Sequence, residues 1–115
     1  MEDSATRGPE TIDRLRREID EIDRRLLELF NERARCVVAI GHIKRVSGQA
    51  LYQPDREREI FERAEAANPG PLSNRAIRRL FERILDESRS VERHVMEPGT
   101  GEASAKPGAG EGGER

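Results

Sequence analysis

The chain has 115 residues, a length that fits one domain. Its 21 basic and 23 acidic side chains give a formal net charge of -2, so it lacks the positive field that would attract nucleic acid or an anionic membrane. No apolar run is long enough for a membrane span or a signal peptide, and we therefore expect a cytoplasmic protein. The single cysteine, Cys36, excludes an internal disulfide, and with only two histidines no metal site is expected.

The sequence predicts an all-α fold of three helices, of which the first is the longest. Apolar residues recur at steps of three and four from Ile12 to Leu29, and helical character continues from about Thr11 to Ser47, where Gly48 can cap the helix. This helix would be roughly 55 Å long at 1.5 Å per residue. A compact monomer of this size could not easily cover it.

Two shorter helices follow, and none of the segments shows strand alternation. Pro54 marks the start of the second helix, which ends before the breaker Asn68-Pro69-Gly70. Ser73 is the expected N-cap of the third helix, which carries apolar residues as far as Val95.

Both ends of the chain have compositions unsuited to folding. The tail at 97–115 is rich in Gly and Pro with few bulky apolar residues, and residues 1–8 are similar. We therefore expect one domain at 9–96 with a disordered segment on each side.

Two cations occupy positions of the first helix where its apolar rhythm calls for hydrophobic residues. The step after Leu29 falls on Arg33, and the same rhythm leads through Val37 and Ile40 to Lys44. Eleven residues at about 100° each return Lys44 to within about 20° of Arg33. Burying unpaired cations costs several kcal/mol, so these two predict anionic partners, either carboxylates of the protein or an anionic ligand.

The other helices also place polar residues toward the interior. Ser88 and Glu92 border the apolar face of the third helix, and Glu57 shares a face with the apolar residues of the second, where Arg56 precedes it. An internal polar network without a ligand would satisfy this pattern. A pocket for an anion is favoured because the cations outnumber the acids.

The order and spacing of these residues resemble the all-helical chorismate mutases of the AroQ class. The likeness covers about residues 9–95 and is carried by Ile19-Asp20-Glu21-Ile22-Asp23, Leu26-Leu27-Glu28-Leu29, Arg33, Gly41-His42-Ile43-Lys44, Asp55-Arg56-Glu57-Arg58-Glu59, Phe81, Ser88 and Glu92. The resemblance implies a homodimer of intertwined three-helix chains, with each pocket built mostly from one chain. A helix too long for a monomer fits that arrangement.

The resemblance also implies a role for each site residue. Arg16 is the arginine donated by the partner chain, and about 100° of helix rotation separates it from Arg33. Arg16 and Arg33 would bind the two substrate carboxylates with help from Ser88, and Arg56 would lie near a carboxylate. Glu57 would accept the ring hydroxyl. Lys44 and Glu92 would donate to the ether oxygen, with Lys44 also reaching a carboxylate, and Gln53 stands where well-known relatives have Asp.

The implied reaction is the pericyclic rearrangement of chorismate to prephenate, with no cofactor. Many relatives have Gln in place of Glu92, which can donate a hydrogen bond only when protonated, so we expect activity to favour mildly acidic pH. A further pathway enzyme is a candidate partner.

Two alternatives stay open on the sequence. Isochorismate-pyruvate lyases and aminodeoxychorismate mutases resemble the same class and share much of its cationic pocket. A noncatalytic helical dimerisation module, in which the inward charges fix only the register of the helices, would carry the same pattern.

Overall fold

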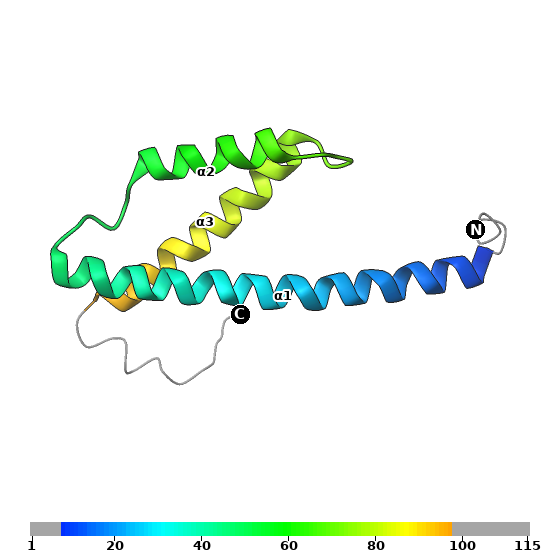
Figure 1. Ribbon diagram of the computed structural model, residues 1–115, viewed down its shortest axis with the longest axis horizontal. Coiled ribbons are helices and arrows are strands. Elements are labelled where there is room, and N and C mark those ends of the chain that lie inside the picture. Colours follow the sequence, from blue (N-terminus) through cyan, green and yellow to red (C-terminus); the bar gives the residue numbers. More distant parts are fainter. Residues whose placement is uncertain (1–7, 98–115) are drawn as a thin grey trace. The chain divides into compact units, whose positions relative to one another are not determined.

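The computed structural model describes residues 8–97 and contains three helices over that range (Figure 1). Helix α1 runs Gly8–Ser47, α2 runs Pro54–Ala67 and α3 runs Asn74–Met96. The all-helical fold is therefore confirmed, with α1 beginning three residues before the expected Thr11. Of the disordered ends expected at 1–8 and 97–115, residues 1–7 and 98–115 lie outside the described residues.

Local chemistry explains where the helices begin and end. Gly48 has φ 79°, and its N–H donates to the Lys44 carbonyl at 2.8 Å, which ends α1 with a left-handed residue as glycine allows. Pro54 begins α2 at a position where a missing N–H costs nothing. The Ser73 hydroxyl accepts the Ala76 N–H at 3.0 Å and caps α3.

The described chain divides into two units within α1, between Arg35 and Cys36. In the first unit, the predicted apolar stripe of α1 is open to solvent in the single chain. Its members are between 41% and 58% exposed: Ile12, Leu15, Ile19, Ile22, Leu26 and Leu29. This stripe is thus an apolar surface without a cover in one chain.

The second unit contains the end of α1, with α2 and α3 joined by a short loop at 68–73 (Figure 1). Asn68 organises the loop, because its amide donates to the Leu72 carbonyl and to Asn74 Oδ1, both at 2.8 Å. On α3, the Arg78 guanidinium lies 4.2 Å from the centre of the Phe61 ring of α2 and forms an ion pair with Glu65 at 2.9 Å. These contacts hold α2 and α3 together.

The described residues contain neither a membrane-crossing helix nor a cluster suited to a metal. Among them, no helix combines the length and apolar content that crossing a lipid bilayer requires. Within 8–97, no three or more His, Cys, Asp or Glu side chains are grouped so that they could hold a metal ion.

Candidate active site

Lys44 is buried in the second unit, as the helical rhythm predicted. The residue is 6% exposed, although the three turns of α1 around it are mostly open to solvent. Its Nζ donates to the Leu51 carbonyl at 3.2 Å and lies 2.6 Å from Glu92 Oε2. A lysine buried to this degree requires such partners, because an isolated ammonium would lose its hydration without compensation.

Glu92 brings the opposite charge from α3 and is also buried, at 8% exposure. Oε2 lies 2.6 Å from Lys44 Nζ, so the two side chains form a close ion pair that is buried between α1 and α3.

Gly41 lets α3 approach α1 next to this pair. A Cβ atom at Gly41 would lie 3.2 Å from both Cβ and Cγ1 of Val95, and 3.5 Å from Cγ of Glu92. The close approach accounts for a glycine inside a helix, where it costs about 1 kcal/mol relative to alanine. It also brings the backbone that carries Glu92 within reach of Lys44.

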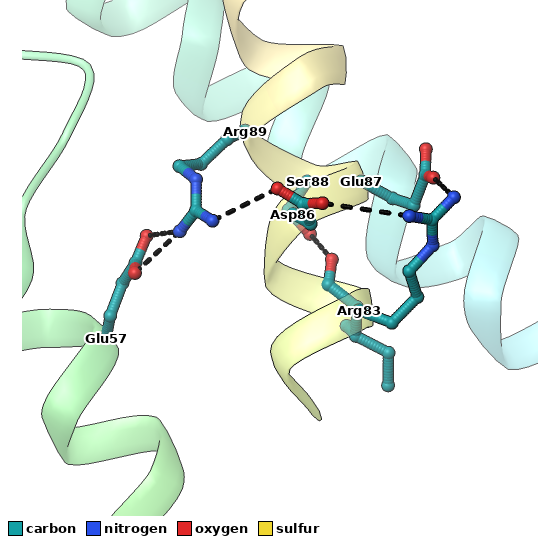
Figure 2. A network of polar contacts seen from close by, with 7 residues as sticks. Glu57, Arg83, Asp86, Glu87, Ser88 and Arg89 are labelled. Carbon is teal, nitrogen blue, oxygen red and sulfur yellow. Dashed lines mark hydrogen bonds and ion pairs between the residues drawn. The ribbon is translucent and has the colours of Figure 1, made fainter. Parts of the chain in front are cut away.

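Glu57 and Ser88 lie in the same unit, half-buried on α2 and α3. Figure 2 shows Glu57 facing Arg89, whose Nη1 contacts Oε1 at 2.7 Å and Oε2 at 2.6 Å. Arg89 Nη2 also donates to Asp86 Oδ1 at 3.2 Å. The Ser88 hydroxyl donates to the Ile84 carbonyl at 2.9 Å, one turn earlier on α3. Four of the predicted inward groups of the second unit are thus at least half-buried: Lys44, Glu57, Ser88 and Glu92.

Two predicted site residues of α2 lie on the surface of the single chain. Gln53 is exposed at the N-cap position of α2 and makes no side-chain capping bond. Arg56 donates to Glu59 at 2.9 Å along its own helix, and this hydrogen bond lowers the pKa of the Glu59 carboxyl. The expectation that Arg56 points to the interior is therefore not met in the single chain, because an acid one turn away offers it a solvated partner.

The remaining two arginines belong to the first unit. Arg16 is exposed and Arg33 is half-buried. A residue that is donated to the pocket of a partner chain would be exposed in the single chain. The role of Arg16 in the site stays a prediction.

Comparison with known proteins identifies the family. The model of the family "Chorismate mutase type II" matches residues 15–93, which is more than half of the chain. The chain belongs to the type II chorismate mutase family. It is 41% identical over 88 residues to the bifunctional chorismate mutase/prephenate dehydratase of Neisseria gonorrhoeae, a match that covers 73% of this chain and 24% of that protein.

Solved chorismate mutases have the same fold. The Form II structure of the Thermus thermophilus chorismate mutase is 39% identical, with a TM-score of 0.70 over 71% of this chain and 93% of that one. The Helicobacter pylori chorismate mutase in complex with prephenate is 25% identical, with a TM-score of 0.71 over 77% of this chain and 97% of that one. The chain spans about a quarter of the bifunctional relatives but nearly the whole of these two solved chorismate mutases.

Sequence reasoning missed one residue beside the predicted site residues, Arg89. The chain has 19 arginines, most of which have acids three or four residues away, so the sequence gives no sign that Arg89 prefers Glu57, 32 positions earlier. The sequence did offer one signal. Arg89 lies one residue after Ser88 and three before Glu92, which puts it within about 60° of Glu92 around the helix.

Proposed function

We propose that this chain catalyses the rearrangement of chorismate to prephenate. The observation that carries the proposal is the burial together of Lys44 and Glu92, the two residues to which the family resemblance assigns the ether oxygen of chorismate. The family match and the Helicobacter pylori relative with bound prephenate support the same substrate class. They favour the mutase over the lyase, the aminodeoxychorismate mutase and the noncatalytic module.

The reaction breaks the ether C–O bond while a C–C bond forms between the enolpyruvyl arm and the ring. Negative charge grows on the ether oxygen in the transition state, and fixed donors there lower the barrier. The Lys44 ammonium has three N–H bonds. One donates to the Leu51 carbonyl and the ammonium lies against the Glu92 carboxylate, so a further N–H can be donated to a ligand oxygen. Glu92 supplies the second donor when its carboxyl is protonated.

The other predicted residues bind the substrate and hold its reactive shape. We assign the two carboxylates to Arg16 and Arg33 with help from Ser88, on the strength of the resemblance. Glu57 accepts the ring hydroxyl. Arg56 and Gln53 would complete the pocket from the start of α2. For this, Arg56 would have to exchange its contact with Glu59 for one with a substrate carboxylate. Holding the flexible arm over the ring supplies the rest of the rate enhancement.

A homodimer completes this site in the proposal. The exposed apolar stripe of α1 is the surface that a second copy would cover, and an exposed Arg16 is available to the partner's pocket. A larger pathway-enzyme partner is also proposed, because several relatives combine a chorismate mutase with a prephenate dehydratase.

Two experiments test the proposal. Incubation of the purified protein with chorismate should consume chorismate and yield prephenate at matching rates, with isochorismate and aminodeoxychorismate assayed separately. Absence of chorismate turnover would overturn the proposed activity.

The donated arginine is tested by mixing two inactive variants, Arg16→Ala and Lys44→Ala. A mixed dimer contains one pocket with neither substitution, so activity should return after the two variants exchange subunits. No recovery in a demonstrated mixed dimer would contradict the assignment of Arg16.

A further inference from the structure

Arg89 of α3 and Glu57 of α2 form an ion pair between the two helices, and the proposed function assigns no role to Arg89. Arg89 Nη1 lies within 2.7 Å of both Glu57 oxygens, and the side chains are 30% and 20% exposed. Most other ion pairs of the described residues join positions three or four apart on one helix and are roughly half exposed, as between Arg83 and Glu87. Figure 2 shows Arg89 extending from α3 toward α2, away from that surface pair.

The second guanidinium nitrogen fixes Arg89 from its own helix. Nη2 donates to Asp86 Oδ1 at 3.2 Å, so the planar group is held between an acid of α3 and an acid of α2. The hydrogen bond to Glu57 raises the pKa of Arg89 above its ordinary value, with smaller contributions from Asp86. A guanidinium held in this way restricts the Glu57 carboxylate to one orientation.

The arrangement also balances charge among the inward acids. Glu92 faces the Lys44 ammonium and Glu57 faces the Arg89 guanidinium. Without Arg89, Glu57 would be a half-buried carboxylate with no cation at this distance, and it would repel a substrate that carries two carboxylates. Arg89 thus affects the acid that the proposed function assigns to the ring hydroxyl.

We propose that Arg89 is a positioning residue of the active site, which orients and neutralises Glu57 so that this carboxylate accepts the substrate hydroxyl without repelling the substrate. The inference rests on the proposed function. The hydroxyl contact exists both in bound substrate and in the transition state, so its loss weakens binding more than it slows the chemical step.

Steady-state kinetics of a double-mutant cycle test this role. Arg89→Gln should raise KM for chorismate about tenfold while kcat changes less than about twofold, the scale expected for a charge-assisted hydrogen bond. Arg89→Lys, which keeps the charge, should recover part of the KM. In a Glu57→Gln background, Arg89→Gln should add less than about a twofold change, because the group through which it acts is already neutral.

A control is Arg24→Gln, which removes an arginine of α1 that pairs with Glu21 and Glu28 and not with Glu57 or Asp86. We expect this control to leave KM unchanged. A full Arg89 effect in the Glu57→Gln background would overturn the inference by showing direct contact with substrate. A lower Tm with unchanged KM would overturn it by showing a structural role alone. If the native protein has no turnover, the proposed function itself fails, and the two failures are thus distinguished.

Discussion

The buried pair Lys44–Glu92 leads to a prediction about stability that is independent of catalysis. Lys44→Met keeps most of the side-chain length and removes the charge, which leaves Glu92 buried without its cation. The side chains are 8% and 11% exposed, so the pair has the burial at which loss of one partner costs about 3–5 kcal/mol. The hydrogen bond to the Leu51 carbonyl is lost as well and belongs to the same estimate. We expect Lys44→Met to lower the free energy of unfolding by about 3–5 kcal/mol at neutral pH.

Urea denaturation followed by circular dichroism at fixed protein concentration measures this loss. The control is Arg24→Met, which removes exposed pairs of α1 with Glu21 and Glu28 at 2.5 and 2.8 Å. Despite these short distances, the control should hardly move the urea midpoint, because exposed pairs contribute little. A Lys44→Met variant that unfolds at the native midpoint at neutral pH would refute the reasoning from burial.

Three further outcomes are expected. Gly41→Val should lower the free energy of unfolding by about 1–3 kcal/mol in urea denaturation, because a Cβ at this position would lie 3.2 Å from Val95. A stability equal to that of the native protein would contradict the close packing. Ser73→Ala should cost about 1 kcal/mol in the same assay by removing the bond to the Ala76 N–H, whereas Ser73→Asp should retain most of the stability. In Glu92→Gln, kcat/KM should lack the decline toward alkaline pH that we expect of the native protein, and identical pH profiles would exclude protonated Glu92 as a donor.

The fold could be predicted because the signals that set its helices are local. Gly48, Pro54 and Ser73 each act through their own backbone or the next turn, and the structure bears out all three. The burial of Lys44 and Glu92 was also predictable, since a charged residue on an apolar step of a helix needs a partner in the interior.

Arginine partners were harder to predict because the side chain is long and several acids are within its reach. Arg56 follows the intrahelical rule and contacts Glu59, whereas Arg89 bonds both to Asp86 on its own helix and to Glu57 on another. The choice depends on how α2 and α3 are placed in space, which the period of either helix alone does not encode.

The burial pattern links folding to assembly. Among the described hydrophobic residues, Leu85 alone is buried within the single chain, while Leu26 and its neighbours on α1 are largely exposed. A domain of this size needs a substantial buried apolar area to offset the entropy of ordering its backbone. In the proposed dimer, association would supply this area and would also deliver Arg16 to the site. Dilution, or a charge placed on the stripe by Leu26→Asp, should therefore reduce helicity and activity together. Full helicity in a Leu26→Asp monomer would separate folding from assembly and refute this coupling.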